Sequence, residues 1–395
     1  MTHEEPVFSQ LEKIVNEQDI SVALAWLVDH FRTSGEHHQL FETRKMQVRH
    51  GLGLSLLYRN EPDQLDEPTQ RSLEDGLLEV CREVGTLLFK KGELREGWMY
   101  LQPVGDRELN ESLLKQIEVN DDNRDTIIEV ALHEGAAPEY GYAMLLEGFG
   151  TCNAITTFDT HCIRFDSSVR QNLAALLVVH LYKELVNNIR NHIEQHEKSL
   201  PESESLNELL QDRQWLTEGG NHHVDTTHLA SLMRIGRIVH SADELGQLHE
   251  LTRYGAMLSS DFHYQGDPPF EDCYRDHGLF YRALVTDDPE AAEAAIKHFE
   301  QKTKTVDRAQ YGAAAVETLV DLLCRLGRNQ QALEVYTEQL YRQEDLVGIA
   351  PNIFDIAKSP EEISFLTTFF RSQNDLLGFS VGLLSSKSHA ASGQK

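Results

Sequence analysis

The chain has 395 residues, of which 40% are apolar, and a formal net charge of −28. This charge excludes nucleic acid and anionic membranes as expected partners, because no cluster of Lys and Arg offsets it, whereas metal cations, cationic partners and neutral ligands stay open. The apolar fraction is too high for a disordered chain, and five widely spaced cysteines without a Cys-x-x-Cys pair indicate a reducing compartment rather than a disulfide framework.

Residues 1–120 are expected to form helical hairpins. Residues 1–6 lack the apolar core of a signal peptide, and no run approaches the roughly 20 apolar residues of a membrane span, so we predict a cytoplasmic protein. Two short patterns place a turn between two helices and a small residue where the helices cross. They are Asp19-Ile20 followed by Ala23 and Leu27, and Gly85 and Leu88 followed by Gly92, Leu94 and Gly97.

Small polar residues interrupt the helical pattern between positions 150 and 161. They are Cys152, Asn153, Thr156 and Asp159. Buried polar groups need partners, so these side chains either hold two helices together, which we favour, or line a pocket. In the second case Cys152 is a candidate nucleophile, with His133 or His161 as its base.

The clearest single element is a helix predicted from Ser167 to about Glu197. Its apolar residues recur at steps of four, which places them along one helical stripe. They are Val169, Leu173, Leu177, Leu181, Leu185, Ile189 and Ile193. Asp166 is a candidate N-cap, and Pro201 follows the end. His192 and His196 share one face, which we interpret as solvated rather than metal-binding.

The strongest polar cluster follows Gly219-Gly220. His223, Asp225 and His228 are three good metal-ligand types within six residues. Asp225 is also well placed to cap a helix that begins at Thr226. We favour the capping interpretation and keep a metal or catalytic role as the alternative.

A second polar cluster spans residues 266–277. Glu271 and Asp272 follow a double proline, where carboxylates stabilise a helix N-terminus. Asp272 and His277 would complete a zinc, iron or manganese site if they met His223, Asp225 and His228, and Glu271 would then be the general base. This metal site is a hypothesis that depends on the two clusters lying together.

The C-terminal part, residues 286–384, contains the fullest helical-hairpin pattern. A helix ends at Gly327, a polar turn follows, and Ala332 and Tyr336 open the next helix; Asp288-Pro289 with Ala292 and Ile296 is a weaker case. Gly378-Phe379-Ser380-Val381-Gly382 matches a nucleophile elbow, but no strand precedes Ser380, so we reject that interpretation. Residues 385–395 are predicted to be a disordered tail.

The pattern around Gly327 resembles the middle of a tetratricopeptide repeat (TPR), in which helical hairpins stack into an α-solenoid. The central residues 121–285, with strings such as 150–156, resemble uncharacterised bacterial helical proteins, a resemblance that implies no activity. Strand signals are poor throughout. We therefore predict an all-α fold of stacked antiparallel hairpins with a distinct central region.

Three functions are compatible with this prediction. The leading one is an interaction or scaffold protein whose concave face binds a peptide or protein partner. The alternative is a metal-dependent hydrolase or lyase that uses the His and Asp clusters. The third is a ligand sensor without turnover, so whether the chain is an enzyme stays open at this point.

Overall fold

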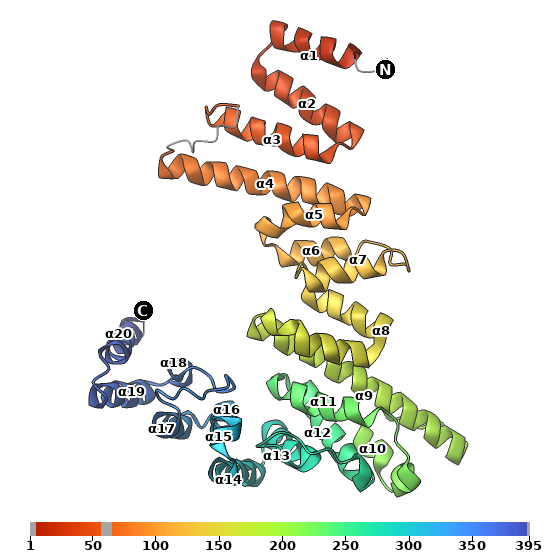
Figure 1. Cartoon of the computed structure of the whole chain (residues 1–395), viewed down its shortest axis with the longest axis vertical. Coiled ribbons are helices and arrows are strands. Elements are labelled where there is room, and N and C mark those ends of the chain that lie inside the picture. The colour runs from red at the N-terminus through yellow and green to blue at the C-terminus, as the bar shows by residue number, and fades with distance from the viewer. Residues whose placement is uncertain (1–4, 57–64, 393–395) are drawn as a thin grey trace. The chain divides into compact units, whose positions relative to one another are not determined.

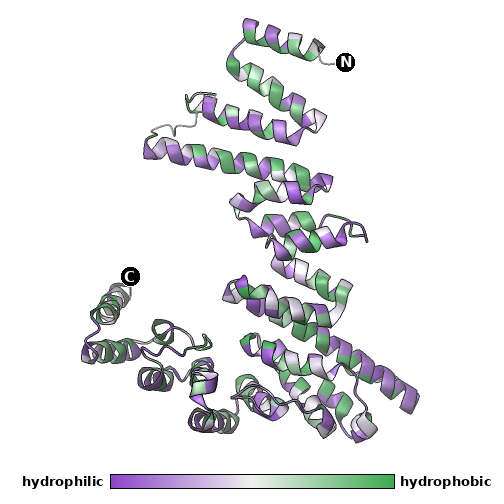
Figure 2. Cartoon of the chain, viewed as in Figure 1, coloured by the Kyte–Doolittle hydropathy of each residue, from purple (hydrophilic) through white to green (hydrophobic). Residues whose placement is uncertain are grey.

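The computed structural model describes residues 5–56 and 65–392, and it is helical throughout (Figure 1). Within these ranges the only β-type pairing is an isolated bridge between Gln265 and Asp272. The all-α prediction is therefore confirmed. Figure 2 shows that most helices carry hydrophobic and hydrophilic residues side by side, as amphipathic helices that pack against their neighbours do.

The chain divides into two compact units, Met1–Gly150 and Thr151–Lys395. This boundary lies inside the central region of the sequence-based division at 120, 285 and 384. It falls at Gly150, whose φ of 76° and ψ of 178° kink α8 (Pro138–Thr160).

The first unit is a series of short antiparallel helices. They are α1 (Glu5–Glu17), α2 (Ile20–Ser34), α3 (His37–Gly51), α4 (Glu67–Lys91), α5 (Leu94–Leu101), the 3-10 helix η1 (Gln102–Val104), α6 (Arg107–Leu114), α7 (Arg124–Ile128), the π-helix η2 (Glu129–His133) and the first part of α8. Each of α2 to α5 packs on the next helix in the chain. Figure 1 shows this succession in red and orange.

Glycine makes the closest crossing in the first unit. A Cβ on Gly85 of α4 would lie 2.6 Å from Cγ of Leu101 and 2.9 Å from the carbonyl oxygen of Gly97 in α5. The two helices therefore meet backbone to backbone. Gly97, the small residue that the sequence pattern places at this crossing, therefore lies where it was expected.

The second unit contains the rest of α8 and the remaining helices. They are η3 (Cys162–Arg164), α9 (Ser167–Glu197), α10 (Leu206–Leu210), η4 (Gln214–Gly220), α11 (Thr226–Ile235), η5 (Gly236–Ile238), α12 (Ala242–Met257), η6 (Ser260–Phe262), α13 (Cys273–Val285), α14 (Pro289–Thr305), α15 (Arg308–Tyr311), α16 (Ala314–Arg325), α17 (Asn329–Gln339), α18 (Ile353–Ile356), α19 (Pro360–Ser372) and α20 (Leu376–Ser392).

The predicted long helix is α9. Asp166 Oδ1 accepts a hydrogen bond from the Val169 amide at 3.0 Å, and Lys198 ends the helix in the left-handed conformation at φ 60°. All seven apolar residues of the predicted stripe are buried. Periodicity and capping together were sufficient to predict this element.

The four predicted hairpin patterns all fall at turns between packed helices. These pairs are α1 with α2, α4 with α5, α13 with α14, and α16 with α17. In the last pair Gly327 has a φ of 72° and the Arg328 amide donates to the Leu323 carbonyl oxygen at 2.8 Å, which closes the turn. The structure thus supports a helical-repeat architecture.

Of the tail predicted at residues 385–395, residues 385–392 are assigned to α20, and residues 393–395 lie outside the described part. This segment lacks an apolar stripe, but it also contains no Gly or Pro that would end a helix before Gly393. Ser380 lies inside α20, and its hydroxyl donates to the Leu376 carbonyl oxygen at 2.7 Å. Gly378 and Gly382 lie against Phe370 and Thr367 of α19 and serve helix packing. No helix in the described ranges is long and apolar enough to cross a membrane.

Candidate functional site

His223, the centre of the first predicted cluster, links three elements through hydrogen bonds. Its Nε2 lies 2.8 Å from Nδ1 of His192 in α9, and its Nδ1 lies 3.0 Å from the Tyr254 hydroxyl in α12. Asn188 donates to its carbonyl oxygen at 2.7 Å. Burial and the neighbouring His192 lower the pKa of His223 to about 4, so its ring is neutral at physiological pH.

The histidine pair on α9 contacts the ring of Trp215. His196 stacks on Trp215 with ring centroids 4.0 Å apart, and His192 meets the same indole edge-on at 5.2 Å. His192 is half-buried and His196 is exposed, so this face is largely solvated, as expected, and carries an aromatic contact that was not expected. Trp215 comes from the 3-10 helix η4, which the periodicity of α9 alone could not place.

Asp225 and His228 behave as the capping interpretation predicts. Asp225 Oδ1 accepts from the amides of Thr227 at 2.8 Å and His228 at 3.4 Å, which caps α11. The Thr227 hydroxyl, which donates to the same oxygen at 2.6 Å, lowers the pKa of the Asp225 carboxyl most, and the amides of Thr227 and His228 lower it further. His228 lies half-buried in the first turn of that helix.

The second predicted cluster is also held in structural contacts. Asp272 caps α13 through the Arg275 amide at 3.3 Å, and Glu271 forms an ion pair with Lys302 of α14. His277 is 3% exposed and stacks on Phe270 at 4.2 Å, with its Nδ1 2.6 Å from the Cys273 carbonyl oxygen. Burial lowers its pKa to about 3.

These contacts leave the metal hypothesis without support. Asp225 and Asp272 are caps, His223 and His277 have separate partners, and Glu271 is paired with an ammonium group. Across the residues that the structure describes, no three His, Cys, Asp or Glu side chains gather as metal ligands do. Asp276, one turn after Asp272, is a 1% exposed carboxylate that lies 3.0 Å from His298 and 3.3 Å from Lys302, so it too has structural partners.

Among the polar residues predicted in α8, Asp159 binds a neighbouring helix. Asp159 forms a two-fold ion pair with Arg234 of α11, with distances of 3.0 and 2.6 Å. Thr156 donates to the Cys152 carbonyl oxygen at 3.0 Å within α8. Asp159 therefore agrees with the favoured interpretation of this segment. Cys152 is exposed in the second unit and His133 ends η2 in the first, so their pairing stays a prediction.

The second unit contains a pocket of about 600 Å³ that no predicted site residue lines. Its walls come from α8, α9, α11, η5, α13, α16 and the segment 347–351. Apolar side chains such as Phe158, Ile238 and Phe280 form part of the wall, and Arg170, Arg234 and Arg237 form another part. Such a mixture of apolar surface and few convergent polar groups is typical of binding sites.

Comparison of the chain with family models, curated proteins and solved structures gives no match. The function of the pocket therefore has to be argued from its own residues.

Three arginines line this pocket, and they differ in their partners. Arg234 is neutralised by Asp159. Arg237 donates from Nε to the Arg234 carbonyl oxygen at 3.1 Å and lies 4.8 Å from the centre of the Phe270 ring, and burial lowers its pKa. Arg170 has a buried Nε with no acceptor among the described residues. Neither Arg170 nor Arg237 forms an ion pair with a carboxylate among the described residues, although Asp267 and Asp321 act on Arg237 from a longer distance.

A buried glutamate shapes one wall of the pocket. Glu317 of α16 is 2% exposed, and its carboxylate accepts from the amides of Val347 at 2.6 Å, Ile349 at 2.6 Å and Ala350 at 3.1 Å. Hydrogen bonds to a charged acceptor are strong. Glu317 therefore fixes the segment 347–351, which contributes backbone and apolar side chains to the pocket.

Asp321 is the acidic residue of the pocket lining. Burial raises its pKa to about 6, although Arg325 lies 3.7 Å away on the same helix. Arg325 itself donates to the carbonyl oxygens of Arg237 at 2.6 Å and Val239 at 2.5 Å. These bonds tie α16 to the end of η5 and hold Arg237 at the pocket.

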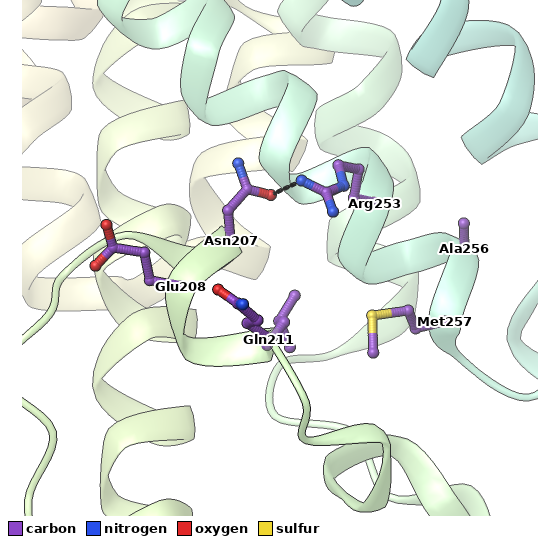
Figure 3. Close-up of a pocket in the computed structure, with 7 residues that line it drawn as sticks. Asn207, Glu208, Gln211, Arg253, Ala256 and Met257 are labelled. Carbon is purple, nitrogen blue, oxygen red and sulfur yellow. Dashed lines mark hydrogen bonds between the residues drawn. The ribbon is translucent and has the colours of Figure 1, made fainter.

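A second depression, between α10 and α12, is less suited to binding. Figure 3 shows Asn207 and Arg253 pointing toward each other, and their side chains form a hydrogen bond. The Asn207 amide also donates to Glu250 at 2.8 Å. Because these polar groups satisfy one another, a ligand would have to break existing bonds.

The sequence only weakly indicates the pocket lined by Arg170, Arg234 and Arg237. Arg234 and Arg237 are three residues apart at the end of a helix with an apolar stripe, and Arg170 lies in the first turn of α9. Their convergence depends on the packing of α9 on α11 and η5. Single-sequence periodicity does not reveal which helices pack together.

Proposed function

We propose that the chain is a TPR-like helical-repeat interaction protein of the cytoplasm whose second unit binds a segment of a peptide or protein partner. The observation that carries this proposal is the pocket bounded by Arg170, Arg237, Phe280 and the segment 347–351. Its volume of about 600 Å³ lies within the range of ligand sites in proteins.

The pocket wall supports a polypeptide ligand in particular. Val347 is 51% exposed and Ile349 is 37% exposed, so apolar surface continues from the pocket to its rim. Exposed apolar side chains next to convergent polar groups are a feature of surfaces that bind other proteins. The α-solenoid folds that the hairpins resemble bind partners along such extended surfaces.

Site-specific photo-crosslinking tests this proposal. A photoreactive amino acid replaces Val347 in one variant and, as a matched control, Ile163, which is 63% exposed in the same unit and does not line the pocket. The Val347 variant should yield one defined adduct in cells, and the Ile163 variant should not.

The adduct alone does not complete the test. The captured protein is identified, purified and shown by calorimetry to bind the unmodified chain with one-to-one stoichiometry. A binding role for this pocket would be contradicted if both variants captured the same protein in the same yield. It would also be contradicted if the Val347 variant captured none.

A further inference from the structure

We infer that the group recognised in this pocket is a carboxylate on an acidic, partly apolar peptide segment, bound by Arg170 and Arg237. The inference rests on the proposed function and names the chemistry of the partner. It runs against the overall charge of the chain, which by itself disfavours anionic partners.

Arg170 provides the first observation. Its Nε is buried, faces no acceptor within the described ranges, and belongs to a side chain that lines the pocket. A buried donor without an acceptor destabilises the folded protein. A bound carboxylate would provide the missing acceptor.

Arg237 provides the second observation. Only its Nε has a hydrogen-bond partner in the described structure, the Arg234 carbonyl oxygen, and no carboxylate there forms an ion pair with it. The neighbouring Arg234 and Arg325 show the contrast, since each pairs with an aspartate. A guanidinium with free Nη donors matches the two oxygens of a carboxylate.

Asp321 favours a carboxylate over a phosphate as the group bound in this pocket. It lines the same pocket and carries a negative charge above a pKa of about 6. A phosphate group with a charge near −2 would meet stronger repulsion there than a single carboxylate. The apolar wall of Phe158, Ile238 and Phe280 adds a place for the side chain next to the acidic residue.

A peptide-binding experiment tests the inference on the full chain. The probes are fluorescent, acetylated and amidated hexapeptides that alternate Glu with Leu, the same peptides with Gln in place of Glu, and the same peptides with phosphoserine in place of Glu. We expect saturable binding of the Glu peptide, weaker by about 10- to 100-fold with Gln, which is the range for hydrogen bonds to charged groups.

Variants of the two arginines test whether their side chains bind the peptide carboxylate. Arg170→Gln and Arg237→Gln should each weaken binding of the Glu peptide at least tenfold, whereas Arg328→Gln, outside the pocket and paired with Glu293, should leave it unchanged. Arg237→Lys should restore only part of the affinity, because an ammonium group cannot bind both oxygens. Arg170→Gln removes no hydrogen bond or ion pair that its side chain makes to the described residues, so it separates loss of binding from loss of folding.

Equal affinity for the Glu and Gln peptides, preference for phosphoserine, or no binding of any peptide would each overturn the inference. These results differ from a failure of the proposed function, which is read from crosslinking at position 347. A partner that crosslinks there but lacks an acidic segment would refute only the carboxylate inference.

Discussion

Arg170 is a residue whose side chain is better explained by ligand binding than by the stability of the fold. Its unpaired buried Nε contributes nothing favourable to the folded chain that the described contacts show. Residues of this kind are expected at binding sites, because a ligand completes their hydrogen bonds.

We predict that Arg170→Met raises the free energy of unfolding by about 1 kcal/mol while it weakens binding of the Glu peptide, because it removes an unsatisfied donor and keeps the aliphatic stem. Urea denaturation followed by circular dichroism measures the change. Arg328→Met, an exposed control, should change stability by less than about 0.5 kcal/mol. A clearly destabilised Arg170→Met protein would mean that this arginine is structural.

Because His277 is buried, we predict that the folded chain loses stability as the pH decreases. Its pKa is about 3 in the folded chain, against 6.5 for an exposed histidine. Below pH 6.5 the unfolded chain therefore binds a proton that the folded chain does not, so stability is full above pH 6.5 and falls as the pH decreases toward 3.

The variant His277→Leu should flatten this part of the profile, because it removes the titrating ring and leaves a side chain of similar size. Denaturation at several pH values between 7 and 4 measures the slope for both proteins. Wild-type His223 has the same sign of shift, so part of the acid sensitivity should persist in the variant. Identical slopes would show that His277 titrates outside this range.

At the scale of helices, glycine at a crossing determines how closely two elements approach. We predict that Gly85→Ala destabilises the chain by about 1–3 kcal/mol, because the new Cβ would meet Leu101 and the Gly97 carbonyl oxygen. Gly51→Ala in α3 is the matched control, since nothing lies within 4 Å of its Cβ position. Thermal unfolding measures the melting temperatures of the two variants, and equal values would contradict a tight α4–α5 crossing.

Elements were predictable from local information, and their contacts were not. The stripe of α9, the caps at Asp166 and Asp225, and the turn at Gly327 are encoded within a few residues of one another. His277 carries no such local signal, because the burial of a polar residue on α13 depends on how that helix packs on its neighbours. The candidate metal ligands were chosen for their chemistry, and the same carboxylates serve as caps and ion pairs.

The pocket lined by Arg170, Arg234 and Arg237 was not predicted, because it too depends on contacts between helices that are distant in sequence. Net charge is a sum over the whole chain, whereas a binding site depends on which few charges are left unpaired. Arg170 and Arg237 are 67 positions apart in sequence, and packing of α9 on η5 brings both to one pocket. The net charge of −28 therefore does not by itself determine the charge of a group that this pocket can bind.

For the whole molecule, this contrast between a locally positive pocket and a globally negative surface predicts an unusual dependence on salt. An acidic peptide is repelled at a distance by a net charge of −28 and attracted only inside the pocket. Added salt screens exposed charges over about 10 Å at 0.1 M and acts less on partly buried pairs. The association rate constant should therefore rise between about 10 and 150 mM NaCl, opposite to electrostatically steered binding.

Stopped-flow fluorescence with the Glu peptide measures this rate directly. Peptides with one, two and three Glu residues provide the control, because the salt effect should grow with their charge while the dissociation rate changes less. If the association rate instead falls with salt, attraction extends beyond the pocket, and the surface around it must be positive rather than acidic. If the association rate of Arg237→Gln still rises with salt while its dissociation is faster than that of the wild type, the attraction lies at the guanidinium groups and the repulsion on the rest of the chain.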